Sequence, residues 1–164
     1  MEDSREGIIV NERTIAAAQQ IQPYGTVLDQ ASTISSNASL VTREDSTLAS
    51  RFLLTLMSQA NLVHLTRSEQ MGNRKSLRIG LPGFGCKYCC QVGRLGLCRI
   101  FPARRRTLSA KARDLYEHLK RCSLCPSNVK ELLQQLQLET QKGSETDAEK
   151  EKEFFDRVWA RLGH

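Results

Sequence analysis

The stretch that decides the fold is Cys86-Lys87-Tyr88-Cys89, followed after a gap of 28 residues by His118-Leu119-Lys120-Arg121-Cys122. Two cysteines separated by two residues after a glycine turn can present both sulfurs to one ion. The segment that holds His118 and Cys122 has helical periodicity, so these two side chains are expected on one face, one turn apart. Three thiolates and one imidazole suit tetrahedral Zn²⁺. All four positions come from the protein, so the predicted zinc ion is structural and not catalytic.

The choice of the four ligands leaves an alternative open. Cys125 forms a second two-residue-spaced pair with Cys122 and could displace His118, which would give a four-cysteine set. Cys90 and Cys98 are not expected to be ligands, because Cys90 must point away from its neighbour Cys89 and Cys98 lies within a predicted strand.

All six cysteines fall within forty residues of one another. Because the chain starts without an apolar secretory signal, we expect a reducing compartment, in which clustered cysteines bind metal more often than they form disulfides. Free buried thiols that pack as small apolar side chains, and a disulfide or redox role, are the alternatives.

The sequence around the metal motif predicts a β-hairpin followed by a helix. Ser76–Leu81 alternates apolar and polar residues and is a predicted strand, and Leu97–Phe101 is predicted as a second strand. The glycines and the proline between them, from Pro82 to Gly96, predict a loop with sharp turns. Thr107–Arg121 is predicted as a helix, with an apolar face made of Leu108, Ala112, Leu115 and Leu119.

Three further amphipathic helices are predicted outside this module. Leu48–Leu65 has apolar residues at helical spacing, and so do Ser127–Gln141 and Glu149–Leu162. The fold class is therefore α+β, a small zinc-stapled hairpin and helix flanked by α-helices. We divide the chain into a disordered region (1–40, with a short helix possible over Glu12–Gln22), a zinc-binding module with its adjoining helices (41–142), and a short linker with a C-terminal amphipathic helix (143–164).

Charge is unevenly distributed along the 164 residues. Residues 48–127 contain 15 Lys and Arg but only three acidic residues, whereas both flanking regions are acidic and the whole chain has a net charge of +6. A basic middle of this kind is typical of modules that bind polyanions. We expect its cationic edge to contact a nucleic acid, DNA in preference to RNA, through Arg99, Arg104, Arg105, Arg106, Lys111, Arg113, Lys120 and Arg121.

Other function classes find less support in the sequence. Motifs of nucleotide-binding loops, nucleophile elbows and zinc proteases are missing, and acidic residues are too rare in the basic middle for paired acid–base catalysis, so an enzyme is not expected. The alternative function is a protein-interaction adaptor that uses the C-terminal helices, with Phe154, Phe155 and Trp159 against a partner. No membrane span and no small-molecule substrate are predicted, and an intracellular, nuclear location is expected.

The glycine turn with its Cys86–Cys89 pair, which we call the knuckle, is followed by a strand and by the helix end Leu115–Cys122. Over about forty residues this arrangement resembles the BED-type zinc finger of transposase-derived DNA-binding proteins. This resemblance implies that Cys86, Cys89, His118 and Cys122 bind zinc and that the module binds DNA. The wider layout of residues 40–162 also resembles an uncharacterised algal protein group, to which no activity is attached. That layout comprises an apolar helix, Gly-Leu-Pro-Gly-Phe-Gly-Cys, Arg-Ile-Phe-Pro and a terminal Phe-Phe-Asp-Arg-Val-Trp helix.

Overall fold

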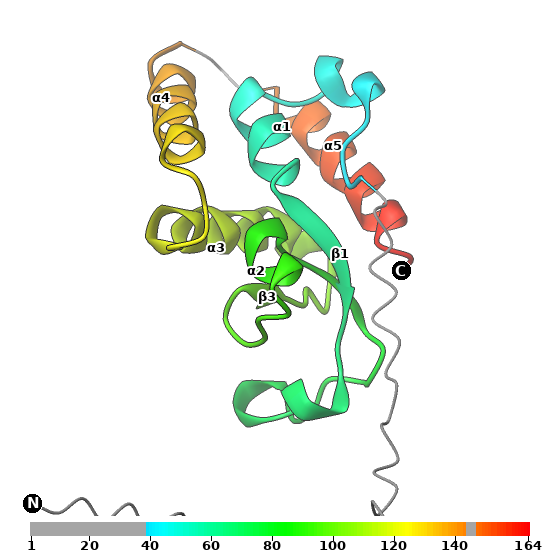
Figure 1. Cartoon of the computed structure of the whole chain (residues 1–164). Coiled ribbons are helices and arrows are strands. Elements are labelled where there is room, and N and C mark those ends of the chain that lie inside the picture. Colours follow the sequence, from blue (N-terminus) through cyan, green and yellow to red (C-terminus); the bar gives the residue numbers. More distant parts are fainter. Residues whose placement is uncertain (1–38, 144–146) are drawn as a thin grey trace, which may run out of the picture. The chain divides into compact units, whose positions relative to one another are not determined.

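A computed structural model describes residues 39–143 and 147–164 (Figure 1). It confirms the α+β class. The elements in chain order are η1 (Arg43–Thr47), α1 (Arg51–Met57), β1 (Ala60–His64), η2 (Arg67–Glu69), η3 (Gly72–Arg74), β2 (Pro82–Cys86), α2 (Lys87–Gln91), β3 (Arg99–Ile100), η4 (Arg105–Thr107), α3 (Leu108–Arg121), α4 (Ser127–Gly143) and α5 (Ala148–Arg161), where η marks a short 3-10 helix. The disordered region predicted over residues 1–40 lies outside the described residues as far as residue 38, as does the helix predicted over Glu12–Gln22, whereas Leu40 is described and is buried.

The three strands form one antiparallel sheet in the order β1-β2-β3. Ala60 of β1 lies opposite Cys86 and His64 opposite Pro82, while Phe84 lies opposite Ile100 of β3. The strand predicted over Leu97–Phe101 is confirmed in a shorter form. The strand predicted over Ser76–Leu81 is wrong, because these residues lead into the sheet and the strand itself starts at Pro82.

Two of the glycines that were predicted to form a turn, Gly83 and Gly85, lie instead in the central strand β2, where neighbouring atoms leave no room for a side chain. A Cβ at Gly83 would overlap the backbone oxygen of Ile100 and lie 2.7 Å from the Phe101 ring. A Cβ at Gly85 would lie 3.0 Å from the Cys90 sulfur and 3.1 Å from the Cys98 oxygen. The two glycines therefore allow β3 and the knuckle to pack closely on β2.

The helix predicted over Leu48–Leu65 is also wrong beyond its first half. Helix α1 begins after Ser50, whose hydroxyl accepts a hydrogen bond from the Leu53 N–H at 3.2 Å, and it ends at Met57. From Ala60 the chain is a strand instead, because its backbone groups pair with β2. An apolar run of this length fits both periodicities, and the tertiary pairing decides between them.

Helices α3, α4 and α5 confirm the three remaining helix predictions to within two residues at each end. The predicted apolar face of α3 is buried, and Leu133 of α4 and Phe154 and Phe155 of α5 lie in the same core. The aromatic residues proposed as a docking face on α5 thus largely pack inside the chain, while Trp159 is half-buried and stacks on His164. In the described part of the chain, no helix combines the length and the apolar character needed to cross a membrane.

Candidate metal centre

The knuckle is built where β2 passes into α2. Cys86 is the last residue of β2 and Cys89 lies one turn into α2. The backbone N–H groups of Tyr88 and Cys89 donate to the Cys86 sulfur. The same pattern recurs at the end of α3, where the N–H groups of Leu124 and Cys125 donate to the sulfur of Cys122, the C-terminal cap residue. Both two-residue-spaced cysteine pairs therefore orient their first sulfur by backbone hydrogen bonds.

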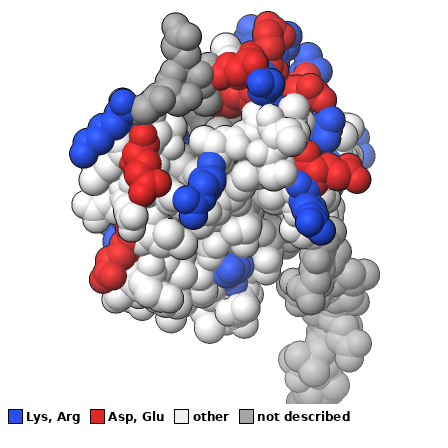
Figure 2. All heavy atoms as spheres, turned by 90° about the horizontal axis from the view of Figure 1, so that it is seen from above, with Lys and Arg blue, Asp and Glu red and all other residues white. Residues whose placement is uncertain are grey.

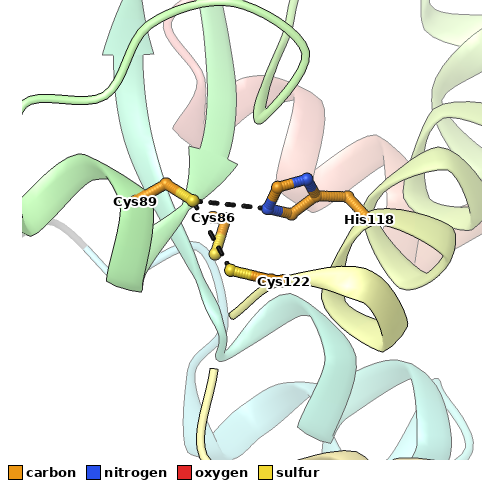
Figure 3. Close-up of side chains that lie close together, drawn as sticks. All are labelled: Cys86, Cys89, His118 and Cys122. Atoms are coloured by element: carbon orange, nitrogen blue, oxygen red, sulfur yellow. Dashed lines mark hydrogen bonds between the residues drawn. The ribbon is translucent and has the colours of Figure 1, made fainter. Parts of the chain in front are cut away.

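The four predicted ligands point toward one another (Figure 3). All of their ligand atoms lie within 4.8 Å of one another. The Cys89 sulfur is 3.4 Å from His118 Nε2 and 3.5 Å from the Cys122 sulfur. Around a tetrahedral zinc ion with Zn–S bonds of about 2.3 Å and a Zn–N bond of about 2.0 Å, the corresponding separations are about 3.5 and 3.8 Å. The two measured separations are close to these values, and this group could hold a metal ion.

The electrostatics of the group favour a bound cation. Burial raises the pKa of the Cys86 and Cys89 thiols, and the neighbouring sulfurs raise it further. At Cys122 burial acts in the same direction, but hydrogen bonds from backbone N–H groups and from the other thiols outweigh it and lower the pKa. Three thiolates cannot share a buried site without positive charge, which a divalent ion supplies.

His118 provides the fourth side chain and is the least buried of the set. Burial lowers its pKa, and the nearby Arg94 guanidinium lowers it further, so the imidazole is neutral at pH 7. A neutral imidazole has the free lone pair that metal binding needs.

The other three cysteines lie outside this group. The Cys125 sulfur contacts the Pro126 oxygen at 3.8 Å, so His118 and not Cys125 completes the cluster. The Cys98 thiol donates to the Arg94 oxygen at 3.3 Å, and the Cys90 sulfur lies against Gly85.

The structure corrects one residue of the predicted basic surface. Arg99 is 7% exposed, and its guanidinium pairs with the buried Glu69 carboxylate at 3.1 Å and donates to the His64 oxygen at 2.9 Å. It is a buried residue whose charge is paired inside the protein. Charge counts along the sequence could not distinguish it from its exposed neighbours.

The remaining seven basic residues lie on η4 and α3 or directly beside them. Four of them form ion pairs that are exposed to solvent: Arg105 with Asp156, Lys111 with Asp114, and both Lys120 and Arg121 with Glu117. Arg104, Arg106 and Arg113 are exposed and have no acidic partner within ion-pair distance in residues 39–143 and 147–164.

Figure 2 shows the face seen from above the view of Figure 1. There Lys and Arg are interspersed with Asp and Glu, and uncharged surface separates them over much of the face. This face therefore does not present a uniformly basic patch.

Comparison of the chain with protein-family models, with curated proteins and with solved structures found no match.

Proposed function

We propose that the chain is a zinc-stabilised, non-catalytic module that binds nucleic acid, with duplex DNA as the preferred partner. The observation that carries this proposal is the Cys86, Cys89, His118 and Cys122 cluster, in which protein side chains fill every position of a tetrahedral site. Sulfur-rich sites of this geometry select zinc among the common divalent ions.

The ion would act as a staple between two parts of the module. Cys86 and Cys89 belong to the β2–α2 knuckle, whereas His118 and Cys122 belong to the last turn of α3. A bound ion thus fixes the orientation of α3 against the sheet. The free energy of zinc binding, about 10 kcal/mol or more in small zinc modules, adds to the stability of that arrangement.

The fixed helix carries the basic edge. Arg104 and Arg106 precede the first turn of α3, where the N-terminal end of the helix dipole adds positive potential, and Arg113 lies further along the same helix. The ion pairs of Arg105, Lys111, Lys120 and Arg121 are solvent-exposed, and such pairs contribute little to stability. They can therefore exchange their carboxylate for a phosphate at low cost.

The resemblance to BED-type fingers supports the same assignment. It implies two ligands from a knuckle and two from the end of the following helix, which are the residues that converge in this fold. It also implies DNA as the ligand.

A salt titration with a labelled 20-base-pair duplex tests the proposal. We expect affinity to fall steeply with salt, and we expect Arg104→Ala/Arg106→Ala/Arg113→Ala to reduce the slope of log K against log salt by about 2 to 3, because each lost phosphate contact removes about 0.9. The matched control is Arg43→Ala/Arg51→Ala/Lys142→Ala, which removes the same charge from exposed residues elsewhere.

Two results would contradict the proposal. One is the absence of duplex binding by the zinc-loaded chain at about 50 mM salt, where electrostatic binding is strong. The other is an equal loss of slope in both triple variants, which would indicate an effect of net charge alone. A duplex RNA of the same sequence, run in parallel, tests the preference for DNA.

A further inference from the structure

A groove lies between two loops on the side of the sheet that ends in β3. One wall comes from residues 68–77, the other from residues 95–101, and α3 contributes Lys111 and Asp114. Its volume is about 860 Å³. The apolar side chains that line it are Met71, Leu77, Leu95, Leu97, Ile100 and Phe101.

Three of these apolar side chains extend into solvent at the groove. Leu97 is 91% exposed, Met71 69% and Leu95 46%. Single exposed apolar residues are common on protein surfaces, but several around one concave site mark a surface that binds a partner. Within the described residues, none of these three is required by the core.

One arginine bridges the two walls of the groove. Arg74 belongs to η3 in the first wall, and its guanidinium donates to the Gly96 oxygen at 3.0 Å and to the Arg99 oxygen at 2.7 Å. The same guanidinium lies 5.1 Å from the centre of the Phe101 ring. These contacts fix the separation of the walls, so the site is formed before a ligand arrives and little ordering is needed on binding.

The contacts of β3 decide how a ligand can bind here. The outward-facing backbone oxygen of Arg99 accepts a hydrogen bond from the Arg74 guanidinium. The backbone N–H of Arg99 donates to the Gly96 oxygen at 3.0 Å. The edge of the sheet therefore has no free backbone groups at Arg99 for an added strand. A ligand must bind through side chains placed in the groove.

The charge around the groove selects the ligand. Residues 66–101 contain seven Lys and Arg and a single acidic residue, Glu69, which is buried. The other acidic residue at the groove, Asp114, is paired with Lys111 at 2.7 Å. Arg67, Lys75, Arg78 and Arg94 are exposed and flank the groove without lining it. A partner with acidic side chains is favoured by this field.

The groove chemistry fits a protein segment better than a nucleic acid. Unpaired bases stack on exposed aromatic rings, whereas the one aromatic ring that lines the groove, Phe101, is 8% exposed and lies under Arg74. The exposed side chains are aliphatic and suit leucine-like or phenylalanine-like side chains of a partner. We propose that the groove binds a peptide segment of another protein that combines large apolar residues with Asp or Glu.

A random 12-residue peptide library displayed on phage and selected on the zinc-loaded chain tests this proposal. We expect the selected peptides to be enriched in acidic and large apolar residues. The strongest of them, made synthetically, should bind Met71→Ser/Leu95→Ser/Leu97→Ser at least tenfold more weakly than the unchanged chain. Replacing its acidic residues by Lys should weaken it by a similar factor.

The matched control is Val92→Ser/Leu138→Ser, which removes exposed apolar side chains outside the groove lining and should leave peptide affinity unchanged. Failure to enrich any peptide, enrichment without acidic residues, or equal binding to both variants would overturn the proposal.

Two further measurements separate this proposal from other uses of the groove. If the groove triple variant lost duplex DNA affinity instead, the groove would belong to the nucleic-acid surface. If sedimentation showed that the unchanged chain self-associates and the triple variant does not, the occupant would be a second copy. Both results would overturn the peptide proposal, and neither bears on the zinc site.

Discussion

Arg161 donates hydrogen bonds from its two terminal nitrogens to the two carboxylate oxygens of Asp45, at 2.6 and 2.9 Å, although 116 positions separate the residues. Asp45 is fully buried, and its Oδ2 also accepts the Thr42 N–H at 2.8 Å. Arg161 extends the contact to the Leu40 oxygen at 3.0 Å. This pair joins the last turn of α5 to η1, at the opposite end of the described chain.

Replacement of Asp45 by Asn should therefore destabilise the fold strongly. The variant leaves the Arg161 guanidinium without its carboxylate, and removing one partner of a buried pair costs about 3 kcal/mol or more. Urea unfolding of Asp45→Asn measures this loss. The control is Arg157→Ala, because Arg157 lies 3.9 Å from the same carboxylate, is more exposed, and should cost less than about 1 kcal/mol. Similar losses of unfolding free energy in both variants would contradict the conclusion that Arg161 is the main partner of Asp45.

The same carboxylate predicts a pH dependence. Burial acts to raise the pKa of Asp45, but the hydrogen bonds from Arg161 and Thr42 outweigh it and lower the pKa. The ionised side chain thus stabilises the fold above about pH 3.9, the ordinary value in an unfolded chain, and this contribution disappears as pH falls through the lower folded-state pKa. We expect the difference in unfolding free energy between the unchanged chain and Asp45→Asn to be constant from pH 7 to about 5 and to shrink below about 4. Comparing the two proteins at each pH removes the effect of acid on the metal ligands, and a difference that already shrinks at neutral pH would be inconsistent with this account.

Substitutions in the cysteine and histidine cluster should separate ligands from bystanders. We expect the unchanged protein to bind about one zinc ion per chain. Cys122→Ser and His118→Ala should each bind much less zinc, because each removes one of four ligands. Cys125→Ser is the matched control and should keep its zinc, since that sulfur lies outside the group. Elemental analysis after dialysis measures the content. A chelator should lower the thermal midpoint of the unchanged chain and of Cys125→Ser by similar amounts. Zinc loss in Cys125→Ser with retention in His118→Ala would reverse the ligand assignment.

Gly83 should tolerate no side chain. Gly83→Ala places a methyl group against the backbone of Ile100, which cannot move without disturbing the sheet, and we expect a loss of at least about 2 kcal/mol. Gly80→Ala is the comparison, because Gly80 has a positive φ of 81° but open space around it, and it should cost about 1 kcal/mol. Chemical denaturation of the two variants shows which of them loses more unfolding free energy. A larger loss for Gly80→Ala would contradict the conclusion that close packing against Ile100 requires a glycine at position 83.

Arg99 should behave as a structural residue in a nucleic-acid assay. Arg99→Met removes the main partner of the buried Glu69, and we expect a loss of about 3 kcal/mol in stability. In conditions where the variant is folded, the salt slope of duplex binding should be unchanged. A reduced salt slope in Arg99→Met would instead indicate that Arg99 contacts the nucleic acid.

Local patterns were sufficient for the metal cluster and for three helices. The spacing of Cys86 and Cys89, and of His118 and Cys122, predicts that the two side chains of each pair lie close together, whatever the rest of the fold. In the structure the two pairs meet in one cluster. The apolar faces of α3, α4 and α5 follow from periodicity because each helix packs one side on the core.

Where local and tertiary preferences differ, the sequence alone was misleading. Residues 60–64 match a helical stripe, yet their strand conformation depends on pairing with β2, which is 18 or more positions away. Gly83 and Gly85 are typical turn residues, but here they are required by the close approach of Ile100, Cys90 and Cys98. Neither requirement is visible within a short window.

Long-range ion pairs were missed for a similar reason. Asp45 accepts a hydrogen bond from the Thr42 N–H three residues away, but nothing nearby in the sequence points to Arg161. Likewise, Arg99 differs from Arg104 only in what surrounds it after folding.

The order of the four ligands along the chain has a consequence during translation. The ribosome releases Cys86 and Cys89 first, and two thiolates alone make an incomplete coordination sphere. His118 and Cys122 emerge about thirty residues later, as the last turn of α3 leaves the exit tunnel. If the cluster holds zinc as proposed, the site is incomplete until then, so capture of the ion would accompany the docking of α3 as a late event in synthesis.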